Sequence, residues 1–171
     1  MINLSPTLKG VVTGLLMIAV SIAIYARFGN FEGQLIFINY LLYIGGIAWT
    51  LIAYSRMEVL KTFKTYFTQG FKCFITVTFL MVIFTFGFLK MTPGMKEEMA
   101  QNYRTELINQ GDKTPAEIET MVLKAKEYYI TQQTSLTIFF YLFAGTVVTV
   151  IISMILMSVR KGHQYQRTIN T

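Results

Sequence analysis

The sequence predicts an all-α integral membrane protein, and three observations support this fold class. Of the 171 residues, 53% are hydrophobic and only 14% are charged, a more apolar balance than soluble domains of this size have. Four apolar runs reach the roughly 20 residues that a helix needs to cross a bilayer. One long polar stretch, about residues 92–133, separates the third run from the fourth. Residues 1–171 are therefore expected to form a single membrane domain.

The four predicted transmembrane helices cover about residues 8–26, 34–54, 71–89 and 134–159. None holds an internal Asp, Glu, Lys, Arg or His, because Lys9 and Lys72 lie at span ends, where we expect their ammonium groups to reach the lipid headgroups. The first run has small residues at Ser21 and Ala23, as a cleavable secretory signal would, but it is long for a signal core. We therefore expect it to remain as the first span.

The connection between the second and third spans has apolar residues at helical spacing. They are Met57, Leu60, Phe63 and Phe67. This pattern predicts a short inner interfacial helix that lies on the membrane surface. The lysines Lys61, Lys64 and Lys72 are candidate contacts for lipid headgroups, although an ordinary positively charged inner loop would contain the same residues.

The long polar stretch predicts an external helical hairpin between spans three and four. Thr92-Pro93 and Thr114-Pro115 are helix-start signals, since Thr can cap free amides and Pro at the first helical position loses no hydrogen bond. Glu117 completes a capping box with Thr114, and Gly111 suits a left-handed helix end. Nothing between Pro115 and Gly145 would break a helix, so the second arm is expected to continue into the fourth span.

Each arm of the predicted hairpin carries an apolar stripe. The candidate interaction face consists of Met95, Met99, Tyr103 and Leu107 on the first arm, and Ile118 and Val122 on the second. Such stripes bury themselves against each other or against a third surface. The spacing of the residues leaves both possibilities open.

The distribution of charge predicts the orientation. The N-terminal arm, the three connections and the tail carry net charges of +1, 0, +3, −1 and +3 in chain order. Positive segments stay in the cytoplasm, so we expect a bacterial cytoplasmic (inner) membrane protein with both termini inside and the hairpin outside. The net charge of +6 then reflects topology, and no nucleic-acid partner is predicted.

The residues needed for common membrane chemistry are scarce. Cys73 is the only cysteine and His163 the only histidine, and neither has a matching group for thiol exchange, haem or zinc. We therefore expect no catalytic residues, no cofactor and no metal. An inner-surface enzyme that uses Lys61, Lys64 or His163 is the most distant alternative.

Small and polar residues inside the spans allow two interpretations. Gly10, Gly14, Gly145, Thr149 and Ser153 are candidate helix-packing residues, either within the bundle or in a homo-oligomer. A second polar set is a candidate cavity lining, although hydroxyls near span ends are more often interface anchors. Its members are Asn39, Tyr40, Tyr43, Thr76, Thr78 and Thr85.

Several segments together resemble an uncharacterised family of small four-span bacterial inner-membrane proteins, a domain-of-unknown-function family. They are the start "LKGVVTGLLM", the stretch "YFTQGFKCF" before span three, the hairpin segment "TPAEIE" and the glycine of the last span. The resemblance covers nearly the whole chain and implies the fold and the inner membrane, without catalytic residues.

The sequence thus favours a non-enzymatic integral membrane protein of unassigned activity, an interaction or assembly subunit that uses its external hairpin. Its expected partners are membrane lipids and a protein partner or homo-oligomer. The alternative is a small-solute transport or lipid-handling protein that acts as an oligomer.

Overall fold

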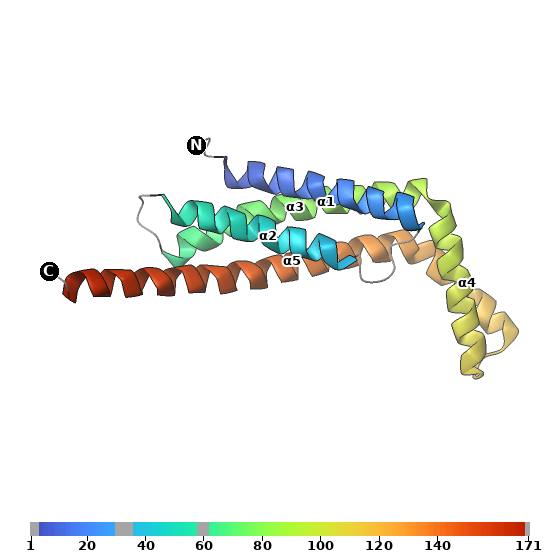
Figure 1. The fold of residues 1–171 in the computed structure, drawn as a ribbon. Helices are drawn as coiled ribbons and strands as arrows, with labels where there is room; N and C mark the ends of the chain where they lie inside the picture. The colour runs from blue at the N-terminus through green and yellow to red at the C-terminus, as the bar shows by residue number, and fades with distance from the viewer. Residues whose placement is uncertain (1–3, 30–35, 58–61, 170–171) are drawn as a thin grey trace. The chain divides into compact units, whose positions relative to one another are not determined.

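A computed structural model describes residues 4–29, 36–57 and 62–169 of the chain. Its elements are all helices: α1 (Pro6–Phe28), α2 (Ile36–Ser55), α3 (Phe63–Met91), α4 (Pro93–Gln110) and α5 (Pro115–Ile169) (Figure 1). No strand occurs among the described residues. The all-α prediction is confirmed.

Four of these helices, α1, α2, α3 and α5, are long and apolar enough to cross a membrane, which confirms the four predicted spans. Two of them are longer than a bilayer requires: α3 has 29 residues and α5 has 55, against about 20 for one crossing. Both therefore continue beyond the apolar layer. As predicted, α5 joins the second hairpin arm and the fourth span in one unbroken helix.

The ends of α1 follow from local chemistry. Ser5 caps the first turn, because its Oγ accepts a hydrogen bond of 3.2 Å from the Leu8 N–H, and Pro6 follows at the first helical position. At the other end Gly29 has a φ of 74° and donates its N–H to the Tyr25 carbonyl at 2.8 Å. Gly29 thus ends α1 in a left-handed conformation, which glycine adopts without strain.

Within the described residues, the predicted interfacial helix does not form a separate element, so that part of the prediction is wrong. Phe63 and Phe67 belong to the first turns of α3, which continues without a break to Met91. The helix begins where the side chains of Thr62 and Thr65 exchange hydrogen bonds with each other's backbone N–H groups. No proline follows to interrupt it. Leu60 and Lys61 lie outside the described residues.

The helices contribute to two compact units. Unit 1 contains Met1–Met81 and Phe139–Thr171, and unit 2 contains Val82–Ile138. Unit 1 consists of α1, α2, the first part of α3 and the second part of α5. Unit 2 consists of the end of α3, all of α4 and the first part of α5.

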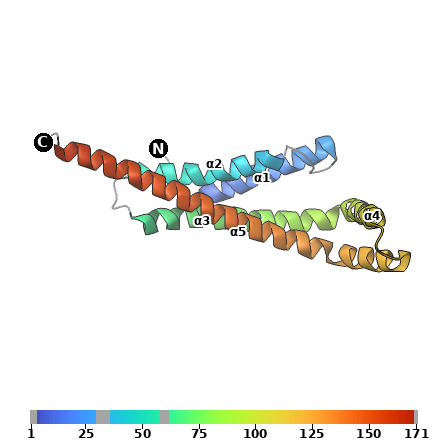
Figure 2. The same ribbon diagram turned by 90° about the horizontal axis from the view of Figure 1, so that it is seen from below.

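Glycines mark the helix contacts within unit 1, where α1 lies beside α2 and α3 beside α5 (Figures 1 and 2). A Cβ added at Gly10 would lie 2.6 Å from the Cys73 carbonyl oxygen, and one at Gly46 only 2.5 Å from the Thr13 Cγ2. Gly70 of α3 is similarly close to Thr149 of α5. Small residues at these three places let the backbones approach closely.

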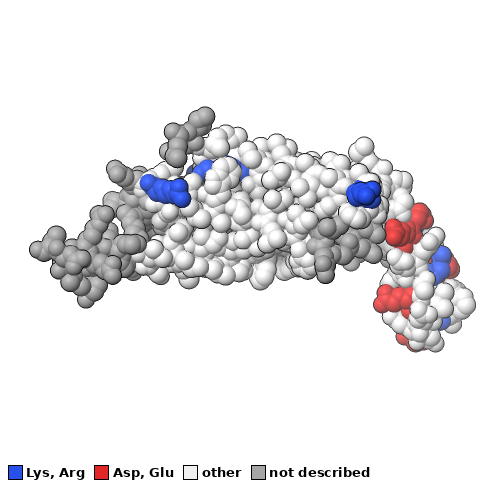
Figure 3. All heavy atoms as spheres, in the orientation of Figure 1, with Lys and Arg blue, Asp and Glu red and all other residues white. Residues whose placement is uncertain are grey.

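The interior of unit 1 combines apolar and polar side chains, and its surface is apolar. The largest fully buried apolar side chains are Met17, Tyr43, Ile47, Leu51, Tyr66, Phe74 and Val77. Exposed positions include Leu15, Leu41, Phe79 and Phe143. The visible surface of this unit in Figure 3 is almost free of charge. Such a surface suits lipid.

Candidate functional site: the helical hairpin

The hairpin of unit 2 forms as its helix-boundary signals predict, with one exception. Gly111 has a φ of 70° and ends α4. The capping box is present: the Thr114 N–H donates to the Glu117 carboxylate at 2.8 Å, and the Glu117 N–H donates to the Thr114 Oγ1 at 3.4 Å. The hydrogen bond from the Thr114 backbone is the main reason why the pKa of Glu117 is lowered. The exception is Thr92, whose side chain makes no capping hydrogen bond.

The candidate interaction face is largely the interior of the hairpin. Leu107 is only 2% exposed and packs with Ile118 and Val122 in a cluster that also contains Ala100. Tyr103 and Met121 pack against this cluster, and Met95 and Met99 are half-buried. The two stripes therefore bury against each other. A partner has no direct access to Leu107, Ile118 or Val122.

The predicted stripe of α4 has a spacing of four residues from Met95 to Leu107 and does not include Ala100. The buried line of α4 instead runs through Ala100 and Leu107, which are seven residues apart and thus on nearly the same face of a helix. An alanine has little apolar surface and is easily overlooked. The seven-residue spacing was the signal that could have identified it.

One edge of the hairpin is joined by two ion pairs between the arms. Arg104 of α4 donates to Glu119 of α5 at 2.8 Å, and Lys126 of α5 pairs with Glu97 of α4. Ile108 lies one turn after Arg104, and Leu123 one turn after Glu119. We call Glu97, Arg104, Ile108, Glu119, Leu123 and Lys126 the bridged edge.

The bridged edge presents apolar as well as charged side chains. Ile108 is 58% exposed and Leu123 is 64% exposed. Arg104 also has an unused donor, because its Nε is buried and makes no hydrogen bond among the described residues. Tyr128, 60% exposed, lies on a different face of α5, five residues beyond Leu123. The edge has the mixed composition of a protein-binding surface.

The candidate packing residues of unit 1 lie inside the bundle. Gly10 and Gly14 of α1 face α3, and Gly145 of α5 approaches Phe74 of α3. Thr149 and Ser153 are 0% exposed, and their hydroxyls have no hydrogen-bond partner among the described residues. Contacts within one chain thus account for all five positions.

The candidate cavity lining is only partly brought together. Asn39 is buried and donates to the Ser21 Oγ at 2.8 Å, while its Oδ1 has no partner among the described residues. Tyr43 is also buried and donates to the Tyr141 carbonyl at 2.7 Å. Tyr40 is exposed and its ring lies 6.3 Å from that of Tyr141.

Two threonine hydroxyls of α3 form hydrogen bonds with backbone carbonyls of the same helix. Thr78 is buried and donates to the Phe74 carbonyl at 2.8 Å, and Thr76 donates to the Lys72 carbonyl at 2.7 Å. Thr85 is half-exposed and belongs to unit 2. The bonded hydroxyls of Thr76 and Thr78 have no donor left for a solute.

The basic residues differ in their surroundings. Lys64 and Lys72 are exposed, as headgroup contacts require, and Lys61 lies outside the described residues. Lys9, by contrast, is buried, so it is not the exposed lysine that its place at a span end led us to expect. It precedes Gly10, whose close contact with α3 turns this side of α1 toward the bundle. His163 falls in a segment whose side chains are not described.

Cys73 is a buried free thiol whose Sγ lies 3.7 Å from the Gly46 carbonyl oxygen. Within the described residues, no group of three or more His, Cys, Asp or Glu side chains is arranged to hold a metal ion.

Comparison with known proteins identifies the family. The sequence pattern described as "Protein of unknown function (DUF4199)" matches residues 9–158, which include all four apolar helices and the hairpin. No curated protein and no solved structure matches the chain. The match covers most of the 171 residues. The chain therefore belongs to the DUF4199 family, which has no assigned function, and the resemblance noted in the sequence is confirmed.

Proposed function

We propose that this membrane protein is a non-enzymatic interaction or assembly subunit whose hairpin binds a protein partner through the bridged edge. The partner is the extramembrane part of another membrane protein, and a second copy of this chain is one form of it. The observation behind the proposal is the pair of exposed apolar side chains, Ile108 and Leu123, beside two ion pairs.

The internal packing of the hairpin supports a role in binding a protein partner. Its own apolar stripes are used internally at Leu107, Ile118 and Val122, so the arms hold each other without a partner. The remaining surface is then free to bind. Apolar side chains at the centre of an interface are commonly surrounded by polar groups, and Arg is enriched among residues that contribute strongly to binding.

The orientation belongs to the same proposal. The balance of basic residues favours a bacterial inner membrane, with both termini in the cytoplasm and the hairpin outside. The partner would then be met on the outer side. The acidic residues visible in Figure 3 lie on the hairpin, which suits a water-exposed segment.

The test is crosslinking in the native membrane, followed by gentle detergent purification and mass spectrometry. The double variant I108E/L123E should lose the crosslinked partner, because two carboxylates would be placed at the centre of the proposed contact. The matched control is Y128E, which introduces the same charge at an exposed residue of a different face. Y128E should retain the partner.

Equal complexes from the wild type and from I108E/L123E would refute the proposed surface. Deletion of residues 93–126 then decides the role of the hairpin. If the partner persisted without the hairpin, the interaction proposal itself would be wrong.

The alternative is small-solute transport or lipid handling by an oligomer, and one observation favours it. Asn39 Oδ1, Thr149 Oγ1 and Ser153 Oγ are buried and have no partner among the described residues, so the bundle interior has unused polar atoms. Asn39→Leu should lower solute flux in liposomes that contain the purified protein. Unchanged flux would exclude Asn39 from the pathway.

A further inference from the structure

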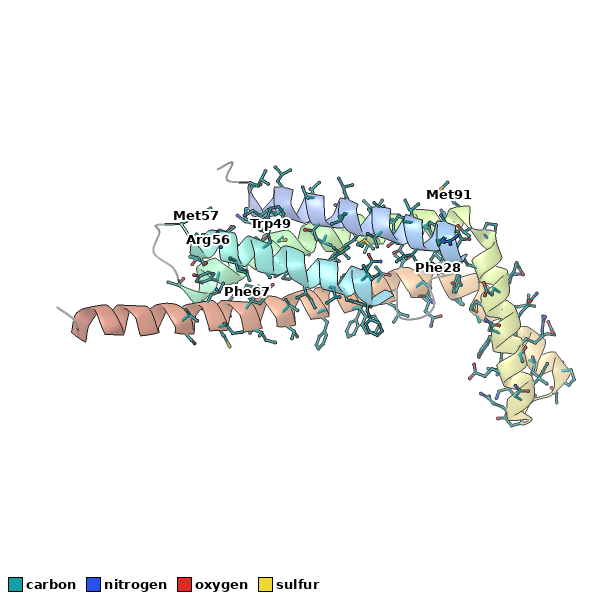
Figure 4. All side chains as sticks on the ribbon, viewed as in Figure 1. Phe28, Trp49, Arg56, Met57, Phe67 and Met91 are labelled. Carbon is teal, nitrogen blue, oxygen red and sulfur yellow. The ribbon has the colours of Figure 1, made fainter. Side chains whose placement is uncertain are left out.

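Lys9 is a buried cation in the membrane bundle. It lies in the first turns of α1 and is 5% exposed. Its Nζ lies 5.6 Å from the centroid of the Trp49 ring of α2. Figure 4 places Trp49 in the part of α2 near Arg56 and Met57. The ammonium therefore lies between helices close to one end of the bundle.

The described groups around Lys9 do not neutralise it. The Trp49 ring attracts a cation through its π electrons but accepts no ordinary hydrogen bond from the three ammonium donors. Thr13 donates to the Lys9 carbonyl at 2.9 Å, and Thr50 donates to the Gly46 carbonyl at 2.9 Å. No ion pair involves Lys9 among the described residues.

Carboxylates are rare in this part of the sequence. Within Met1–Met81 and Phe139–Thr171 the acidic side chains are Glu32 and Glu58, and both lie outside the described residues. The exposed ionisable residues near this end are basic: Arg56, Lys64 and Lys72. A buried charge without a partner is costly, and positive charge at this end attracts anions.

The depth of Lys9 indicates the kind of anion. It is the fourth residue of α1, roughly 5 Å along the axis from the start of the helix at 1.5 Å per residue. Lipid phosphates lie at the edge of the apolar layer, where cationic side chains meet them. Phosphate oxygens would also supply hydrogen-bond acceptors, which the described residues do not provide to the ammonium.

We propose that Lys9 binds a phosphate-bearing anion, the headgroup of an anionic phospholipid or a free phosphate, between α1 and α2. This site is separate from the hairpin and goes beyond the interaction proposed for it. Its ligand is anionic, so a zwitterionic headgroup should not replace it.

The test compares thermal unfolding of the full-length protein in a neutral detergent with added phosphatidylglycerol, phosphatidylcholine or inorganic phosphate. Phosphatidylglycerol should raise the Tm of the wild type by about 5 °C. Lys9→Met should abolish this shift, and without lipid it should be at least as stable as the wild type, because it removes a buried charge. Arg27→Met, which removes an exposed basic residue from the last turn of α1, should keep more than half of the shift.

The added lipids and inorganic phosphate distinguish a phospholipid headgroup from a free phosphate ion. A shift with phosphatidylglycerol alone identifies a headgroup, and a shift of the same size with inorganic phosphate identifies the free ion. If Lys9→Met responded to both anions as the wild type does, the site would not exist.

Glu58→Gln provides the other decisive comparison, because Glu58 is the carboxylate in the connection between α2 and α3. It should leave the lipid shift intact. If Glu58→Gln and Lys9→Met instead destabilised the protein equally and without additivity, Glu58 would be the counterion, and the anion site would be refuted.

Discussion

The bundle of unit 1 and the hairpin of unit 2 distribute polarity in opposite ways. Every buried polar side chain among the described residues belongs to unit 1: Lys9, Thr13, Ser21, Asn39, Thr50, Thr78, Thr149 and Ser153. The buried side chains of unit 2 are apolar, apart from the hydroxyl of Tyr129. All ion pairs of the described residues belong to unit 2.

The surrounding solvent explains this difference. In water, burial of apolar surface holds two helices together, so the hairpin needs Leu107, Ile118 and Val122 inside. In lipid, the surroundings are as apolar as leucine, and helices associate through close packing and hydrogen bonds. The glycine contacts and the bond between Asn39 and Ser21 fit that second case.

The largest expected effect concerns close packing in the bundle, and two adjacent glycines provide the test. Gly46→Leu should destabilise unit 1 by roughly 4 kcal/mol, at the upper end of overpacking costs, because its Cβ would lie 2.5 Å from Thr13 Cγ2. Gly45→Leu should be nearly neutral, since a Cβ there meets nothing within 4 Å. The measurement is thermal unfolding in detergent, and similar loss in both variants would refute packing as the cause.

The second effect concerns the apolar interior of the hairpin. Leu107→Ala should cost about 3 kcal/mol, because it leaves a cavity where Ala100, Ile118 and Val122 meet. The adjacent Ile108→Ala should change the stability by no more than about 0.5 kcal/mol, since that side chain is exposed. Hydrogen exchange of the α4 amides measures the stability of the hairpin in both variants. Equal protection in the two would contradict the described core.

The third effect concerns polar groups in the bundle and should have opposite signs at two positions. Thr149→Val should stabilise unit 1 by about 1 kcal/mol, because it removes a buried hydroxyl that has no partner among the described residues. Tyr43→Phe should destabilise it by about 1 kcal/mol, because it removes the 2.7 Å bond to the Tyr141 carbonyl. Detergent unfolding of both variants is the measurement, and a loss of stability in Thr149→Val would reveal a partner for that hydroxyl.

Local sequence rules predicted most of the fold. Apolar length identified α1, α2, α3 and α5, and Gly111 with the Thr114 and Glu117 pair placed the turn of the hairpin. These features depend on residues near one another in the chain. Sequence alone did not fix the surroundings of Lys9, because a lysine near a span end suits both headgroups and a neighbouring helix, and α1 brings it against Trp49.

The candidate site was predicted less completely for a related reason. Apolar stripes on two arms identified a hairpin, but spacing alone did not decide whether they would face each other or a partner. The positions that stay outside, Ile108 and Leu123, follow only from the pairing of Arg104 with Glu119 and of Lys126 with Glu97. Such pairing between arms is set by tertiary packing.

The smallest effect is a pH dependence confined to the hairpin. The pKa of Glu117 is lowered, first by the hydrogen bond from the Thr114 backbone and then by the Thr114 hydroxyl. The folded hairpin therefore favours the carboxylate. Its contribution to stability is present above the unfolded pKa of about 4.3 and is lost as the pH falls through the lower folded value.

Glu117→Gln should accordingly flatten the loss of hairpin stability between about pH 5 and pH 3, because the amide still caps the helix and does not titrate there. Asp112→Asn is the matched control. The pKa of Asp112 is also lowered, by Lys113, but Asp112 lies outside the capping box. Hydrogen exchange of the first amides of α5, followed against pH, separates the two variants. A wild-type pH profile in Glu117→Gln would show that another carboxylate controls the acid response, whereas a change in the bundle amides would mean that the two units do not respond separately.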